Sequence, residues 1–174
     1  MQTAGASIGD ADPHAAFTAQ LELHAGVVRK VAATYASNRA DRRDLAQEIA
    51  LQLWRAWPRY DPARSFSTWM YRSALNVGIS YLRRAGSAHR QALALEDIGL
   101  DPAAQRGDDS ELEEQVALLR RLIEGLGPLD RGLLLLWLEQ RSYREIAEVL
   151  GIGESNVATR LSRLRARLRG EMGQ

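Results

Sequence analysis

The fold is decided by a stretch near the end of the sequence, from Ser142 to Arg169, which reads SYREIAEVLGIGESNVATRLSRLRARLR. Ser142 and Glu145 have the spacing of a capping box, so a helix is predicted to begin there. Gly151 permits the left-handed backbone of a tight turn, and Gly153 is an acceptable N-cap for the helix that follows. The stretch therefore predicts two helices joined by a short turn.

The second of these helices has one apolar face and one polar, cationic face. The apolar face carries Val157, Leu161, Leu164 and Leu168, at helical spacing. The opposite face carries Ser155, Asn156, Thr159, Arg160, Arg163 and Arg167. A helix fits the major groove of DNA, where arginine pairs with guanine, asparagine with adenine, and serine or threonine with bases or phosphates. An ordinary amphipathic helix with a solvated arginine face is the alternative. The capping box, the glycine turn and the acid-free face together favour DNA.

Length and composition predict a small all-α protein. The 174 residues suffice for one domain or two small ones, and runs of strand-forming residues are hard to find. The absence of cysteine excludes a disulfide framework, a thiolate zinc site and a cysteine nucleophile. No run approaches the roughly 20 apolar residues of a membrane span, and residues 1–12 lack the pattern of a signal peptide. We therefore expect a cytoplasmic protein without membrane insertion.

Charge is segregated along the chain, although the formal net charge is only +1. Arginine dominates residues 59–90 and 155–170, whereas aspartate and glutamate dominate residues 96–115. Lys30 is the single lysine. Two basic segments separated by an acidic one form a segregated charge pattern, although the use of arginine alone is not evidence for phosphate binding.

Helical periodicity organises the remaining sequence into two blocks. In the first block, helices are expected over residues 12–36, 41–57 and 65–84, the second of them stopped by Pro58. The predicted organisation is a disordered tail over residues 1–12, a helical domain over 13–86, a flexible acidic linker over 87–111 and a second helical domain over 112–172. The second domain contains an unusually apolar run, Leu129 to Gln140.

The stretch from Ser142 to Ile152, with Asn156-Val157 and Arg160-Leu161, resembles region 4 of bacterial sigma factors. The first block resembles region 2 of the same family. Asp44-Leu45-Ala46-Gln47-Glu48 with Trp54 is similar to its D-L-x-Q-E segment. Phe66 to Asn76, FSTWMYRSALN, is similar to its F-x-x-W-L-Y-R-I-A-x-N segment, and Tyr81-Leu82-Arg83-Arg84 follows. Two blocks with a short linker are the layout of the extracytoplasmic-function (ECF) group, the minimal sigma factors.

The resemblance implies a role for each block. Region 2 would dock on the clamp helices of the largest polymerase subunit with Asp44, Leu45, Gln47, Glu48, Leu51 and Trp54. It would recognise and melt the −10 promoter element with Tyr60, Phe66, Trp69, Arg72, Asn76, Arg83 and Arg84. Region 4 would read the −35 element with the cationic helix face described above, and Leu129 to Gln140, with Trp137, would pack on the polymerase flap.

Some of these residues also have a plainer interpretation. From the residues alone, Phe66 and Trp69 fit a hydrophobic core better than direct base contact, and most leucines of the apolar run fit a core. Arginines 72, 83 and 84 fit a phosphate contact or a solvated surface equally well. Arg42, Arg43 and Ala158 depart from what many relatives carry at these places, and these departures bear on polymerase docking and on one phosphate contact.

The function implied is that of an alternative sigma factor, a specificity subunit and not an enzyme. Its partners would be core RNA polymerase, promoter DNA and an anti-sigma factor, and no cofactor is expected. His14, His24 and His89 are scattered, and the sequence contains no H-E-x-x-H motif and no P-loop. The alternative is a stand-alone helix-turn-helix regulator whose first block senses a signal or dimerises.

Overall fold

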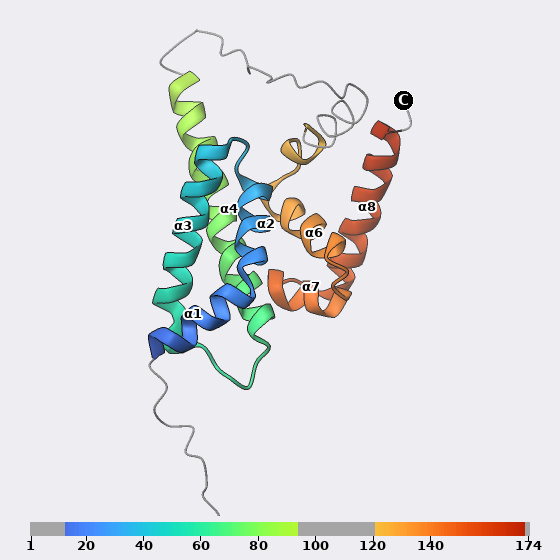
Figure 1. The fold of residues 1–174 in the computed structure, drawn as a ribbon. Helices are drawn as coiled ribbons and strands as arrows, with labels where there is room; N and C mark the ends of the chain where they lie inside the picture. The colour runs from blue at the N-terminus through green and yellow to red at the C-terminus, as the bar shows by residue number, and fades with distance from the viewer. Residues whose placement is uncertain (1–12, 94–120, 173–174) are drawn as a thin grey trace, which may run out of the picture.

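The computed structural model describes residues 13–93 and 121–172, and these residues form helices and their connecting turns, as predicted for an all-α protein (Figure 1). The first block consists of α1 (Pro13–Leu23), α2 (Ala25–Tyr35), α3 (Arg39–Ala56), the 3-10 turn η1 (Trp57–Arg59) and α4 (Phe66–Leu93). The second block contains α6 (Pro128–Leu138), α7 (Tyr143–Leu150) and α8 (Glu154–Met172). The predicted tail, most of the predicted linker and the start of the second domain lie outside the described residues. In the described ranges, no helix is both long and apolar enough to cross a membrane.

The first predicted helix is two helices, because the chain turns at His24. The imidazole Nδ1 of His24 lies 3.0 Å from the Gln20 carbonyl oxygen, and the His24 carbonyl accepts from the Val27 backbone N–H. The turn sets α1 at an angle to α2 (Figure 1). Phe17 of α1 can then pack edge-on against Trp54 and Trp57, while α2 packs against α3 and α4. One straight helix would not reach both places.

Helices α3 and α4 begin and end for local reasons. The side chain of Asn38 accepts a hydrogen bond from the Asp41 backbone N–H and caps α3. Pro58 lies in η1, directly after α3. Helix α4 continues to Leu93, nine residues beyond the predicted end at Arg84, so the first residues of the predicted linker are helical. Alanine, arginine, glutamine and leucine between residues 85 and 93 favour helix enough to offset Gly86.

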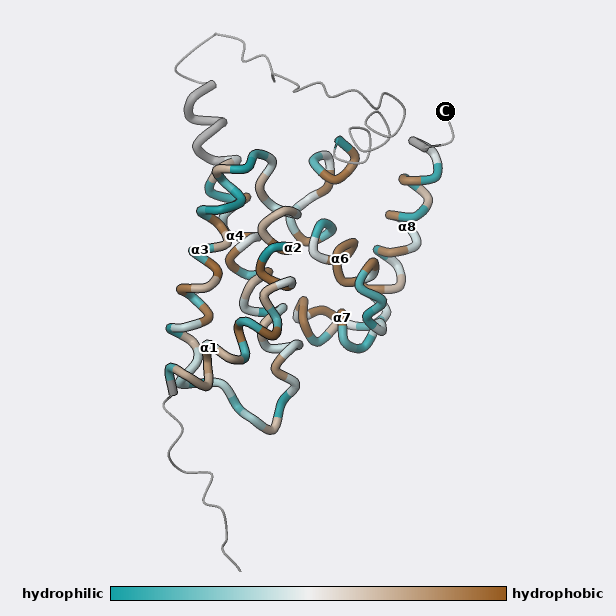
Figure 2. The backbone as a smooth tube through the Cα atoms, viewed as in Figure 1, coloured by the Kyte–Doolittle hydropathy of each residue, from teal (hydrophilic) through white to brown (hydrophobic). Residues whose placement is uncertain are grey.

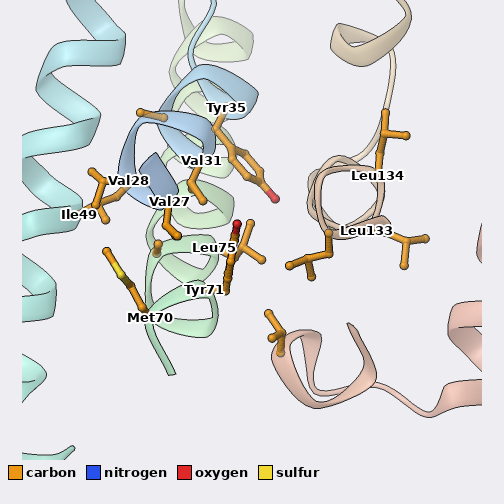
Figure 3. Packing of buried hydrophobic residues seen from close by; sticks show 14 of the residues in the cluster. Val27, Val28, Val31, Tyr35, Ile49, Met70, Tyr71, Leu75, Leu133 and Leu134 are labelled. Carbon is orange, nitrogen blue, oxygen red and sulfur yellow. The ribbon is translucent and has the colours of Figure 1, made fainter. Parts of the chain in front are cut away.

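The hydrophobic core of the first block lies between α2, α3 and α4, where Val31, Ile49 and Met70 are completely buried. Figure 3 shows these three side chains, one from each of the three helices. The core does not end at the first block, because the buried leucines of α6 belong to the same cluster. Helix α6 packs against α2 and α4, and α7 packs against α4. The two predicted domains are therefore in direct contact.

Tyr35 is the side chain on which the two blocks meet. Its ring is 2% exposed and lies against Gly78 of α4, where an added Cβ would be 2.6 Å from the ring Cδ2. Its hydroxyl points toward α6 (Figure 3) and donates to the carbonyl oxygen of Pro128 at 2.8 Å. An added Cβ at Gly132 of α6 would be 2.9 Å from that hydroxyl oxygen. Both glycines are required by this close approach.

Arg131 of α6 fastens the same junction by bonding to carbonyl groups at helix ends. Its guanidinium donates to the carbonyls of Leu126 at 3.2 Å, Glu124 at 2.7 Å and Thr34 at 3.3 Å. The last carbonyls of a helix have no partner inside the helix, and a cation is favourable there. Arg131 is buried, which lowers its pKa, and the three carbonyls compensate for that burial.

A polar cluster borders the junction on the side of α7. The Lys30 ammonium donates to the Glu139 carboxylate at 2.7 Å, and the Tyr71 hydroxyl donates to the same carboxylate at 3.2 Å. The Arg141 guanidinium donates to the Ser67 hydroxyl at 2.6 Å and lies 5.2 Å above the Tyr71 ring. Burial, with Glu139 beside it, raises the pKa of Tyr71 to about 12, so the hydroxyl stays protonated as a donor. We call these five residues the clasp.

The clasp predicts a pH-dependent contribution of Glu139 to stability. The hydrogen bond from Lys30 is the main cause of the lowered pKa of Glu139, and Tyr71 and Arg141 act in the same direction. A carboxylate with a lowered pKa stabilises the fold above its unfolded pKa, about 4.3, and this contribution is lost as pH falls through the folded pKa. We expect Glu139→Gln to lower the free energy of unfolding by up to about 1 kcal/mol at neutral pH.

Urea unfolding of both proteins, followed as the buffer is acidified from neutral pH to below the folded pKa of Glu139, measures this difference. We expect the two unfolding free energies to converge in acid. A difference that is as large in acid as at neutral pH contradicts charge as its cause.

Candidate nucleic-acid interface

The helix-turn-helix of the second block has the predicted local structure. The Ser142 side chain accepts from the Glu145 backbone N–H, and the Glu145 carboxylate accepts from the Ser142 backbone N–H, which completes the capping box. Gly151 has φ 67° and ends α7 in the left-handed conformation. The Ile152 backbone N–H donates back to the Ala147 carbonyl at 3.1 Å. These bonds fix the angle at which α8 leaves the turn.

Helix α8 buries one face and exposes the other. Val157 and Leu161 are completely buried, Leu164 is nearly so, and Leu168 is half-buried. In Figure 2, hydrophilic turns recur along α8 between hydrophobic ones. The predicted reading residues Ser155, Asn156, Thr159, Arg163 and Arg167 are exposed, and Arg160 is half-buried. The structure thus brings the six residues to one accessible helix surface, which we call the reader face.

The arginines of α8 differ in their surroundings. Arg163 makes no ion pair with any residue in the described ranges, whereas Arg160 pairs with Asp130 of α6 at 3.0 Å and donates to the Asn156 side chain at 3.0 Å. Arg165, outside the reader face, lies 4.7 Å above the Trp137 ring. Within the predicted reading set, Arg163 is therefore more accessible than Arg160, which is half-buried.

The residues predicted for the −10 element lie along α4 and the loop before it. Tyr60 stacks on Trp57 with centroids 5.3 Å apart, and Phe66 and Trp69 complete a group of four aromatic rings. All four rings are partly buried, neither core nor free surface. Sequence reasoning did not assign Trp57 to this group, although its position directly before Pro58 placed it next to the loop.

The polar residues predicted for the same task are exposed. Arg72, Asn76 and Arg83 lie on the solvent side of α4. Arg84 is also exposed, but its guanidinium donates to both carboxylate oxygens of Glu48, at 2.9 and 3.1 Å. Arg84 therefore connects the predicted DNA surface of α4 to the predicted polymerase surface of α3.

The predicted docking surface lies on α3, with one exception. Asp44 and Gln47 are exposed, Leu51 is 46% exposed and Trp54 is 36% exposed. Leu45 is 1% exposed and packs in the core, so its side chain cannot meet a partner in this structure. We call Asp44, Gln47, Glu48, Leu51 and Trp54 the α3 face. An acid beside exposed leucine and tryptophan suits a partner that is both basic and apolar.

The apolar run from Leu129 to Gln140 is mostly interior. Leu133, Leu134 and Leu136 of α6 are buried, whereas Leu138 is 60% exposed and Trp137 is partly exposed. The interpretation as core holds for these three leucines. The exposed large apolar side chain of α6 is Leu138, in its last turn.

Sequence reasoning missed the residues that join the blocks, Tyr35, Arg131, Glu139 and Arg141. Their partners lie far away in sequence, and no local motif marks them. The available signal in the sequence was the pair Gly78 and Gly132. Glycine inside a helix is unfavourable unless another segment of the protein approaches it closely.

Comparison with known proteins shows the family. Sigma-70 region 2 matches residues 21–88, and sigma-70 region 4 matches residues 117–168. CnrH, an RNA polymerase sigma factor of Cupriavidus metallidurans, is 30% identical over 162 residues, which cover 88% of this chain and 84% of CnrH. The ECF sigma factor SigE of Mycolicibacterium smegmatis is 30% identical over 149 residues, or 84% of this chain and 57% of SigE.

Two solved structures share the fold across both blocks. Sigma factor RpoE in complex with the anti-sigma factor NepR from Bartonella quintana has a TM-score of 0.69 at 20% identity, covering 91% of this chain and 97% of that one. CnrH in complex with the cytosolic domain of CnrY has a TM-score of 0.67 at 21% identity, covering 95% and 90%.

The two blocks with their matching regions define a bacterial RNA polymerase sigma factor. More narrowly, the chain belongs to the ECF group, and it is an alternative sigma factor, the kind of subunit that directs RNA polymerase to promoters.

Proposed function

We propose that this chain binds core RNA polymerase through the α3 face, reads the −35 element with the reader face of α8, and recognises and opens the −10 element with α4 and the aromatic group before it. The reader face carries the proposal, because it is an accessible, acid-free helix surface held at a defined angle by a capping box and a glycine turn. When it is bound to core polymerase, the chain supplies promoter specificity, and the polymerase catalyses RNA synthesis.

The roles divide between attraction and recognition. The arginines of α8 attract the DNA backbone regardless of sequence, and Asn156 with Arg163 offers donors that match adenine and guanine edges. On α4, Asn76 is exposed and its amide can bond to a base edge. The rings of Tyr60 and Trp69 offer surfaces on which unpaired bases can stack, which compensates for the stacking energy lost when the duplex opens. Each surface is small, so tethering of both to polymerase supplies the effective concentration for promoter binding.

We further propose that an anti-sigma factor controls this chain. RpoE and CnrH, which share its fold, were solved in complex with NepR and with the cytosolic domain of CnrY. The α3 face is accessible to such a partner as well as to polymerase. A partner that covers Leu51 and Trp54 would exclude polymerase from the same side chains.

Transcription reconstituted from purified components tests the proposed function. We expect the chain with core polymerase to start transcripts on genomic fragments, and neither component to do so alone. A chain that shifts specific duplex DNA tightly without polymerase and starts no transcript would instead be a stand-alone regulator.

The docking role of α3 leads to a second prediction. Asp44→Arg places a cation on the α3 face, so we expect its affinity for core polymerase to fall about tenfold or more. Fluorescence anisotropy with labelled protein measures the affinity. Asp44 is exposed, so the urea unfolding midpoint should not change. Glu22→Arg, an equivalent change on an exposed residue of α1, is the control and should bind as wild type does. If Asp44→Arg and Glu22→Arg bind core polymerase with equal affinity, Asp44 is not part of the docking surface.

A further inference from the structure

The polymerase surface proposed on α3 has two carboxylates, and they differ in their partners. Asp44 makes no ion pair with any residue in the described ranges. The Glu48 carboxylate accepts from the Arg84 guanidinium at both oxygens, at 2.9 and 3.1 Å. Arg84 lies on α4, which packs alongside α3 (Figure 1). One of the two charges that the α3 face could offer to a partner is therefore already neutralised by another residue of the chain.

Arg84 holds Glu48 in a way that suits exchange rather than fixed positioning. Its side chain is 63% exposed, and that of Glu48 is 35% exposed. Within the part of the chain that the structure describes, the Arg84 guanidinium bonds to Glu48 alone. An ion pair at this exposure is weak, because water screens it and two long side chains lose freedom when it forms. An arginine with no second anchor cannot hold the carboxylate rigidly for a partner, so the pair is readily opened.

A basic partner that approaches the α3 face meets an ion pair at Glu48 and a free anion at Asp44. To bond to Glu48, a cation of the partner must displace Arg84, which repels that cation for as long as it stays in place. Exposed charges act chiefly on the rate of association, which depends on the net charge that the approaching partner meets. Removal of Arg84 should therefore strengthen the attraction of the α3 face for a basic partner.

We propose that Arg84 competes with core RNA polymerase for Glu48 and thereby sets the affinity of the chain for the polymerase. The proposal rests on the proposed function, because that function assigns Glu48 to polymerase docking. Arg84 was predicted to contact DNA from its place in a motif. The competition gives it a second role, and this role requires no contact between Arg84 and the polymerase.

Equilibrium binding of the labelled full-length chain to core polymerase, followed by fluorescence anisotropy, tests the competition. We expect Arg84→Ala to bind about two- to fivefold more tightly than the wild type, the factor that corresponds to an exposed ion pair. The gain should shrink as salt is added, because salt screens exposed charges. Arg29→Ala is the matched control. It removes the same charge from an exposed residue of α2 and should leave the affinity unchanged.

A double-mutant cycle determines whether the effect of Arg84 is exerted through Glu48. Glu48→Gln keeps the size of the side chain and removes its charge, so we expect weaker binding to core polymerase than that of the wild type. In the Glu48→Gln background, Arg84→Ala should leave the affinity unchanged, because no carboxylate remains to be released. A gain that is present in the wild-type background and lost in the Glu48→Gln background supports the competition.

The other outcomes separate the competition from the proposed function. If Arg84→Ala binds as the wild type does, or more weakly, the competition is overturned and docking through α3 stands. A gain that persists in the Glu48→Gln background also overturns the competition, because Arg84 then acts through net charge alone. If neither the wild type nor Arg84→Ala binds core polymerase, the proposed function is refuted, and the competition with it.

Discussion

Replacing Tyr35 with alanine is expected to lower the free energy of unfolding by about 3–5 kcal/mol, the range measured for removal of a buried aromatic ring. The ring fills the space between Gly78 and Gly132, and neither glycine has a side chain that can move into the cavity. The hydroxyl bond to Pro128 is lost as well. Because the ring contacts α4 and the hydroxyl contacts α6, the loss affects both blocks, and denaturant unfolding of the full chain measures it.

Tyr35→Phe separates the ring from the hydroxyl. It keeps the packing and leaves the Pro128 carbonyl without its donor, so a loss of about 1–2 kcal/mol is expected. Burial raises the pKa of Tyr35, which keeps the hydroxyl protonated over the working pH range. If Tyr35→Ala is no worse than Tyr35→Phe, the ring does not make the contacts described here.

The sequence was sufficient to predict structure that is determined by residues close together in the chain. The capping box of Ser142 and Glu145 and the turn at Gly151 involve residues within a few positions of one another, and their geometry follows from backbone hydrogen bonds alone. The apolar spacing of Val157, Leu161 and Leu164 then fixes which side of α8 is buried. The accessible reader face follows from these two facts.

Where packing between distant segments decides the structure, the prediction was incomplete. The apolar periodicity of the sequence runs through His24 without interruption. The helix nevertheless breaks there, because the turn allows Phe17 to pack against Trp54. Arg131 looks like any surface arginine in the sequence, and it is buried because two helix ends present carbonyls to it. Leu45 was assigned to a docking surface from a motif, although its place in the apolar stripe of α3 indicates the core.

The separation of the chain into two domains illustrates the same limit. A change of composition between two helical blocks predicts a boundary, but it carries no information on whether the blocks then associate. That depends on complementary surfaces, here Gly78 and Gly132 against Tyr35, and Lys30 against Glu139. The partners in these pairs lie far apart in the sequence, beyond the reach of any pattern of local spacing.

The reader face leads to the second large effect. Arg163→Ala is expected to weaken promoter binding of the polymerase complex by about 1–3 kcal/mol, or roughly 5- to 150-fold, if Arg163 reads a base. Arg163 is exposed on α8, so the unfolding midpoint should not change. Arg160→Ala is expected to have the smaller effect, because Arg160 must first leave Asp130 and Asn156 to reach DNA.

The salt dependence of promoter affinity decides what Arg163 contacts. If its partner is a phosphate, Arg163→Ala lowers the slope of log affinity against log salt by about 0.9 and weakens all sequences alike. If its partner is a base edge, the slope is nearly unchanged and discrimination is lost at one position of the −35 element. Arg29→Ala, on an exposed residue of α2, should leave both quantities as in the wild type. Wild-type promoter affinity in Arg163→Ala and Arg160→Ala alike would exclude α8 as the reading helix.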